Sequence, residues 1–98
     1  MICVLADLTI KAGSQEDFFA AARTMLAATR SELGCIRYDL MQDIDDPEHL
    51  TFVEEWESRE ALSAHFDTAH MAAWRTASEP HLVGRKVKIL HVGDVEAL

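Results

Sequence analysis

The order of the periodic segments restricts the fold of this 98-residue chain more than any other feature. Four segments alternate between two faces as β-strands do: residues 2–10, 35–42, 50–56 and 85–92. After the first and third of these strands, apolar residues instead recur at helical spacing. The order β-α-β-β-α-β predicts an α+β, ferredoxin-like (split βαβ) fold, with one antiparallel sheet and helices on one of its faces.

Two capping signals bound the first predicted helix. Ser14, with Asp17 three residues later, resembles a capping box, in which the serine side chain accepts a backbone hydrogen bond. Apolar residues then continue at helical spacing as far as Leu33, and Gly34 is a typical C-terminal cap. The sequence therefore predicts one long helix from Ser14 to Leu33.

The second half of the chain begins with a predicted hairpin. Ile36, Tyr38 and Leu40 are expected on one face of its first strand. An acidic loop over residues 43–49 is expected to join this strand to the next, which begins at Leu50. Two short helices, separated by a break, are then expected before the last strand.

Length and charge narrow the classes of function. Residues 1–98 are expected to form a single domain. The net charge of −8, from 9 basic and 17 acidic residues, argues against nucleic acid and anionic membranes as partners. No apolar run is long enough to span a bilayer, and the N-terminal residues lack the basic region of a signal peptide. We therefore predict a cytoplasmic protein.

The two cysteines, Cys3 and Cys35, indicate neither a disulfide nor a metal site. Neither lies in a CxxC pattern or at a zinc-like spacing from a histidine. In the predicted topology the third strand lies between the first and the second, so a strand separates the two thiols. We expect free thiols and no bound metal.

Both faces of the predicted strands are largely apolar, although the helices can cover only one face. Leu5 and Val4 point to opposite faces of one strand, as do Val53 and Phe52 of another. An open apolar sheet face is typical of an interaction surface. We therefore predict a homodimer in which two sheets pack face to face.

Residues 52–70 contain the only dense cluster of titratable and aromatic side chains. Glu54 and Trp56 share a strand face, and His65 falls within the apolar stripe of the following helix. Together with Tyr38 they could line a pocket in which burial raises the pKa of Glu54. The alternative is structural: a carboxylate paired with a base, and a core histidine satisfied by one hydrogen bond.

Further along the chain, His70 and Trp74 lie one helical turn apart and could form a pocket wall. The sequence has no glycine-rich phosphate loop, no G-x-S-x-G, no HExxH and no dinucleotide fingerprint. Chemistry that depends on a tightly bound nucleotide cofactor is therefore not indicated.

Three segments in combination resemble the antibiotic biosynthesis monooxygenase (ABM) family: GCIRYDL (34–40), EEWESREAL (54–62) and HFDTAH (65–70). The resemblance extends over nearly the whole chain. It implies a dimeric α+β barrel of ferredoxin-like protomers, each with a pocket between helices and sheet. Within the family the chain looks most like small quinol monooxygenases, which oxidise phenolic or quinol substrates with O2 and without metal or flavin.

The resemblance also implies roles for individual residues. His65 would act as a base or as a donor to an oxyanion, Glu54 would orient it, and Tyr38 would donate a hydrogen bond to the substrate. The residues expected to bind a small-molecule substrate are Trp56, His70, Trp74, Arg37 and Phe52. No cofactor is expected.

Two other functions stay open at this point. One is a non-catalytic, small-molecule-binding dimer. The other is an isomerase of a small phosphorylated metabolite related to autoinducer-2, against which the sparse inward basic residues, chiefly Arg37, count. Haem-degrading relatives need an Asn on the first strand and a late helical His, where this chain has Asp7 and Trp74.

Overall fold

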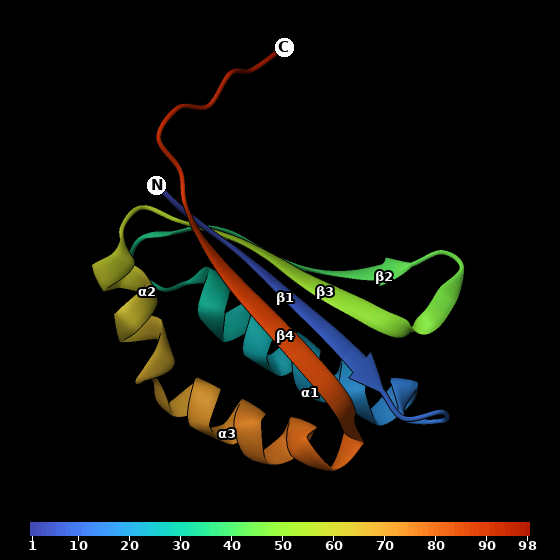
Figure 1. The fold of residues 1–98 in the computed structure, drawn as a ribbon. Coiled ribbons are helices and arrows are strands. Elements are labelled where there is room, and N and C mark those ends of the chain that lie inside the picture. Colours follow the sequence, from blue (N-terminus) through green and yellow to red (C-terminus); the bar gives the residue numbers. More distant parts are fainter.

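The computed structural model describes residues 1–98 and has the predicted order of strands and helices (Figure 1). The elements are β1 (Ile2–Ile10), α1 (Gln15–Arg30), β2 (Cys35–Asp43), β3 (Asp46–Trp56), α2 (Arg59–Phe66), α3 (Ala69–Ser78), the 3-10 helix η1 (Glu79–His81) and β4 (Leu82–His91). This order, in an antiparallel sheet, confirms the α+β, ferredoxin-like fold.

The strands form a single sheet in the order β2-β3-β1-β4. As predicted, β3 lies between β1 and β2, so Cys3 and Cys35 are on strands that are not neighbours, and both thiols are free. The helices all lie on one side of the sheet (Figure 1). The other face of the sheet is covered by no element of this chain.

Alternation along the strands decides which side chains enter the core. The even-numbered residues of β1, and those of β3 from Leu50 to Trp56, are buried beneath the helices. Trp74 of α3 packs edge-on against Phe18 of α1 and Phe52 of β3, with ring centroids 5.1 and 5.7 Å away. These edge-to-face contacts join both helices to the sheet.

The first helix is shorter than predicted, because α1 ends at Arg30. The backbone N–H of Ser31 donates to the carbonyl of Ala28, and that of Glu32 donates to the carbonyl of Thr29, which closes the last turn. Leu33, expected on the buried stripe, is 95 % exposed. The turn brings Glu32 out of the helix and toward α2.

The predicted capping box of Ser14 and Asp17 is also wrong. Ser14 has helical backbone angles, and its side chain makes no capping hydrogen bond. Its hydroxyl instead lies 3.0 Å from His81 Nδ1. Ser58, by contrast, is extended, and its side chain accepts a hydrogen bond from the N–H of Ala61 at 3.1 Å.

The hairpin between β2 and β3 is tighter than predicted. Asp43 pairs with Asp46, so strand structure replaces most of the expected acidic loop and only residues 44–45 form the turn. The third strand thus begins at Asp46 and not at Leu50.

A bulge interrupts the start of β2. The pairing with β3 shifts between Cys35 and Arg37, so one residue of β2 has no partner there. Ile36 is therefore 53 % exposed, whereas Tyr38 is 3 % exposed. Of the residues expected to share a face, Tyr38 alone is fully buried.

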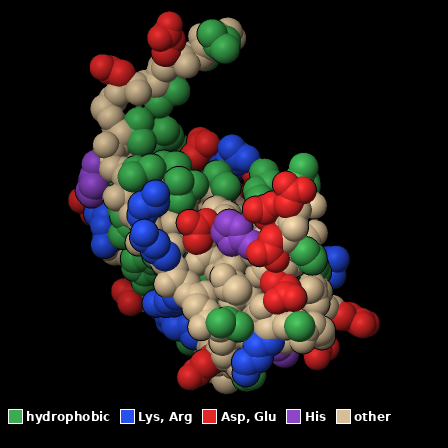
Figure 2. All heavy atoms as spheres, turned by 45° about the vertical axis from the view of Figure 1, so that its right-hand side comes forward, with side chains coloured by type: hydrophobic (Ala, Val, Ile, Leu, Met, Phe, Trp, Pro, Cys, Tyr) green, Lys and Arg blue, Asp and Glu red, His purple; other side chains and the backbone are tan.

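The open sheet face has an apolar centre bordered by charge. Leu5 pairs with Val53 across β1 and β3, and Cys3 pairs with Leu90 across β1 and β4. Figure 2 shows a face on which hydrophobic side chains lie beside lysine or arginine side chains and a histidine surrounded by acidic ones.

None of the helices is long and apolar enough to cross a membrane.

Candidate functional site

A cavity of about 510 Å³ lies between the sheet and the helices α2 and α3. Ten of its sixteen lining residues are hydrophobic, which suits an apolar ring that carries a few polar groups. In another protein, a cavity of about 150 Å³ accommodates benzene. The cavity is therefore large enough for a substituted or fused aromatic compound.

Several of the side chains singled out from the sequence line this cavity. They are Tyr38, Phe52, Glu54, His65 and Trp74. They come from β2, β3, α2 and α3, so the tertiary fold is needed to bring them together. Cross-strand pairing places Tyr38 directly opposite Glu54.

Trp56 lies behind the cavity and does not line it. Its side chain is completely buried, and its indole N–H donates a hydrogen bond to Glu54 Oε1 at 3.0 Å. Its ring centroid is 4.8 Å from that of His65. Trp56 thus contacts Glu54 and His65 on their side away from the cavity and excludes water from them there.

Arg37 lies on the opposite face of the sheet from the cavity. Its guanidinium donates to Asp39 Oδ2 at 2.7 Å and lies 3.8 Å from Glu55 Oε2. Because successive strand residues point to opposite faces, the burial of Tyr38 directs Arg37 outward. This position is incompatible with the predicted contact between Arg37 and a ligand in the cavity.

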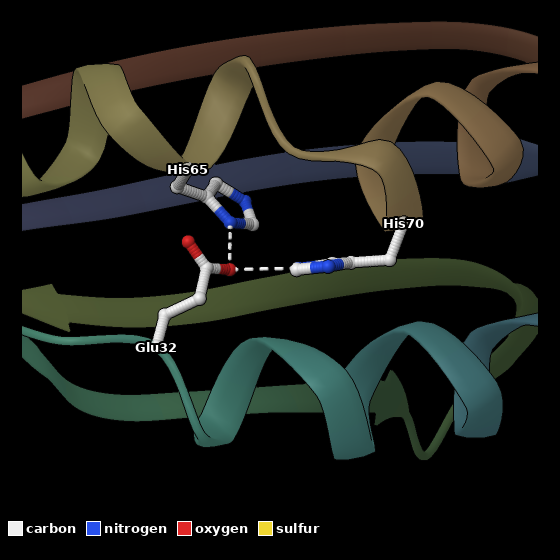
Figure 3. Close-up of side chains that lie close together, drawn as sticks. All are labelled: Glu32, His65 and His70. Carbon is white, nitrogen blue, oxygen red and sulfur yellow. Dashed lines mark hydrogen bonds and ion pairs between the residues drawn. The ribbon is translucent and has the colours of Figure 1, made fainter.

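Three side chains meet at the edge of the cavity: Glu32 from the turn after α1, His65 of α2 and His70 of α3 (Figure 3). One oxygen, Glu32 Oε2, lies 2.6 Å from His65 Nδ1 and 2.8 Å from His70 Nε2. The side chains of His65 and Glu32 are only 1 % and 13 % exposed. His70 belongs to this cluster but is not among the residues that line the cavity.

The contacts of His65 indicate which ring nitrogen carries hydrogen. An ionised carboxylate can only accept, so His65 Nδ1 donates to Glu32. In the neutral ring, Nε2 is then an acceptor, and it lies 3.4 Å from the hydroxyl of Tyr38. Burial lowers the pKa of His65, which favours this neutral form, while the hydrogen bond to Glu32 acts in the opposite direction.

Glu54 does not orient His65, contrary to the role that the family resemblance implied. Glu54 Oε1 accepts from Trp56, whereas Glu32 bonds to His65. Burial raises the pKa of Glu54 to about 7, although its hydrogen bond from Trp56 acts in the opposite direction. Glu54 can therefore change its protonation state near neutral pH.

Tyr38 keeps its proton over the whole physiological range. Burial and the negative charge of Glu54 both raise the pKa of its hydroxyl above the usual value. The hydroxyl thus remains a hydrogen-bond donor between the two ionisable side chains, Glu54 and His65.

No feature of the sequence marks Glu32 as a site residue. It falls within the segment expected to be helical, and its partners His65 and His70 are 33 and 38 residues away. No local motif links positions so far apart. The one available signal is the pair of histidines on either side of a helix break, since two inward imidazoles need an acceptor.

The cavity holds more positive charge than the sequence indicated. Arg75 of α3 and Arg85 of β4 both line it, and neither forms an ion pair. Arg75 donates to the carbonyl of Phe66 at 2.7 Å. Arg85 is exposed, so it is available to an anionic group of a ligand.

Comparisons with known proteins agree with this architecture. The profile of the family described as "Antibiotic biosynthesis monooxygenase" matches residues 1–77. An uncharacterized protein from Synechocystis sp. is 30 % identical over 99 residues, which cover 99 % of this chain and 67 % of that protein.

Solved structures are similar over nearly their whole length. The crystal structure of an antibiotic biosynthesis monooxygenase is 30 % identical with a TM-score of 0.89, covering 96 % of this chain and 100 % of its own. A protein from Pseudomonas aeruginosa is 29 % identical with a TM-score of 0.87, covering 95 % and 94 %. The similarity thus extends to both sequence and fold.

Proposed function

Because the chain belongs to the antibiotic biosynthesis monooxygenase family, we propose that it inserts one oxygen atom of O2 into a small phenolic or quinol compound bound in the cavity. The observation that carries the proposal is the hydrogen bond between Glu32 and His65 beside that cavity. It holds the histidine in the tautomer whose free nitrogen can accept a proton. Residues 1–98 act in this proposal as one domain, and the substrate supplies the electrons without a cofactor.

His65 is the base of the proposed reaction. Nε2 takes a proton from the hydroxyl of the substrate and leaves an electron-rich phenolate that can reduce O2. The imidazolium that forms is stabilised by the carboxylate of Glu32, as in other carboxylate–histidine pairs. Glu32 is a positioning residue, because it acts through His65 and does not line the cavity.

The proposed reaction balances without an added reductant. One quinol and one O2 molecule give one hydroxyquinone and one water molecule, so the organic product gains an oxygen atom and loses two hydrogen atoms. A C–O bond forms at a ring carbon and the O–O bond breaks, while the substrate loses the electrons that reduce both oxygen atoms. The proton held by His65 returns to the oxygen atom that leaves as water.

The other polar residues of the cavity stabilise charge in this scheme. The hydroxyl of Tyr38 donates to the developing oxyanion, and Glu54 exchanges a proton with a second substrate hydroxyl near neutral pH. Trp74 and Phe52 enclose the aromatic ring and exclude water.

We further propose that two copies of the chain associate through their open sheet faces. The paired apolar residues at the centre of this face, such as Leu5 and Val53, would otherwise be exposed to solvent on a sheet with no cover.

One observation favours a second candidate function. Arg75 and Arg85 line the cavity and lack carboxylate partners. A phosphorylated metabolite would suit these arginines, so isomerisation of such a compound is the alternative. It needs no O2, which separates it from the oxidation.

The test is oxygen uptake by metal-free protein with a panel of quinols and phenols, run in 18O2 with mass spectrometry of the product. We expect one 18O atom in the product and one in water. Uptake equal to that of the compound alone refutes the oxidation. Conversion of a phosphorylated substrate under argon supports the isomerase instead, and binding without turnover indicates a non-catalytic binding protein.

A further inference from the structure

The cluster of Glu32, His65 and His70 contains more ligand groups than the proposed oxidation uses. The oxidation needs one imidazole and one carboxylate, yet a second imidazole approaches the same oxygen atom. Glu32 Oε2, His65 Nδ1 and His70 Nε2 all lie within 4.8 Å of one another. We propose that these three atoms bind a divalent transition-metal ion of the Zn²⁺ class.

The charge of the cluster favours a cation. The side chain of Glu32 is 13 % exposed, and its only ion-pair partners are the two histidines. No lysine or arginine forms an ion pair with it, so no permanent positive charge compensates its carboxylate. A carboxylate largely removed from water is costly unless positive charge compensates it, and a divalent ion would supply that charge.

The types of ligand atom select the class of metal. Two imidazole nitrogens suit Zn²⁺ and neighbouring transition metals, whereas Ca²⁺ and Mg²⁺ prefer oxygen ligands alone. Two histidines and one glutamate leave a further position for water, as in zinc sites with three protein ligands. The structure therefore assigns a site for an ion that accepts mixed nitrogen and oxygen ligands.

The ligand side chains must move for the three atoms to reach the spacing of a zinc site. Zinc binds imidazole nitrogen at about 2.0–2.1 Å and carboxylate oxygen at about 2.0–2.2 Å, so tetrahedral ligand atoms lie about 3.4 Å apart. Glu32 Oε2 is now 2.6 and 2.8 Å from the two nitrogens. Glu32 lies in the turn between α1 and β2, where rotation of its side chain can widen both separations. The two nitrogens lie within 4.8 Å of each other and must come closer, which rotation of the more exposed ring, His70, can supply.

Metal binding would change the chemical character of His65. An ion on Nδ1 replaces the hydrogen there, so a neutral ring must carry its hydrogen on Nε2. This nitrogen would then donate a hydrogen bond toward Tyr38, which is 3.4 Å away, and could not accept a proton. The occupied site is thus incompatible with the role of His65 as a base, and the metal acts as an inhibitor.

The test is calorimetric titration of the metal-free protein with Zn²⁺, together with Co²⁺ binding followed by visible absorption. We expect one ion per chain and cobalt bands of a low-coordinate site. Glu32→Gln and His70→Gln each remove a ligand, so each should weaken Zn²⁺ binding by at least the roughly tenfold to hundredfold that loss of an outer-shell partner costs. His49→Gln is the matched control, because His49 also lies near two carboxylates, at 3.3 Å from Asp43 and 3.6 Å from Asp7.

Loss of Zn²⁺ binding in the two cluster variants, with wild-type binding in His49→Gln, supports the site. Equal affinity in the wild type and both cluster variants overturns it, as does a loss caused by His49→Gln alone. Circular dichroism and thermal unfolding verify that each variant is folded. If Glu32→Gln fails to fold, His70→Gln, whose side chain is 24 % exposed in the wild type, decides the question.

Discussion

The buried carboxylate of Glu54 makes the stability of the protein depend on pH in an unusual direction. Burial raises its pKa from 4.5 to about 7 in the folded protein, so the folded chain keeps this proton to a higher pH than the unfolded chain does. Between about pH 4.5 and pH 7 the folded state thus binds more protons, and its stability falls as the pH rises. Above about pH 7 the full cost of the buried charge is present.

The size of the effect follows from the pKa shift. A rise in pKa from 4.5 to about 7, at about 1.4 kcal/mol for each pKa unit, corresponds to about 3 kcal/mol between pH values well below 4.5 and well above 7. Glu54→Gln removes the titration. It keeps a carbonyl oxygen that can accept the hydrogen bond from Trp56, which is 3.0 Å long in the wild type. Part of the effect is already lost at pH 5, so the variant should gain about 2.5 kcal/mol relative to the wild type between pH 5 and pH 8.

The measurement is urea unfolding of the wild type and Glu54→Gln at these two pH values. Other groups also titrate, including His65, whose lowered pKa makes stability rise with pH, so only the difference between the two proteins is interpreted. Glu55→Gln is the matched control, since Glu55 lies on the open face of the same strand and is 31 % exposed. If the wild type and Glu54→Gln have parallel pH profiles, Glu54 is not a desolvated carboxylate and the reasoning is refuted.

Two further predictions concern the fold and the assembly. Gly34→Ala should lower the free energy of unfolding by about 1–3 kcal/mol more than Gly13→Ala. Both glycines have positive φ, but an added Cβ at Gly34 would lie 2.6 Å from Ala61 Cβ, whereas nothing lies within 4 Å of one at Gly13. Equal losses of unfolding free energy for the two variants in chemical denaturation would contradict this. Leu5→Glu should convert the proposed dimer into monomers in analytical ultracentrifugation, whereas Leu33→Glu, at a position 95 % exposed in the turn before β2, should not. Unchanged mass for Leu5→Glu would show that the open sheet face is not the interface.

Much of the fold can be predicted from the sequence because its signals are local. Strand alternation, the Ser58 cap and the helical stripe that contains His65 each depend on a few neighbouring residues, and the structure contains all of them. The errors arise where a tertiary contact overrides a local preference. Ser14 contacts His81 instead of capping α1, and Leu33 is exposed because the helix ends three residues before it.

The candidate site could be predicted only in part, for the same physical reason. Glu54 and His65 are close in sequence, and strand alternation and helical spacing show that both side chains point toward the core. Their convergence on one cavity can therefore be anticipated. Glu32 becomes a partner of His65 only when α2 packs over the turn after α1, a contact that spans 33 residues. Arg85 reaches the cavity from the opposite end of the chain, where strand pattern alone suggests an exposed edge.

The most direct test of the central claim, that His65 is the base of an oxidation by O2, is the turnover rate of His65→Gln. The measurement is oxygen uptake by metal-free protein with the quinol that the wild type consumes fastest. We predict that kcat falls by about 10²–10⁴ with a smaller change in KM, while His49→Gln, on the exposed part of β3, keeps the wild-type rate. A folded His65→Gln protein with wild-type kcat would contradict the account.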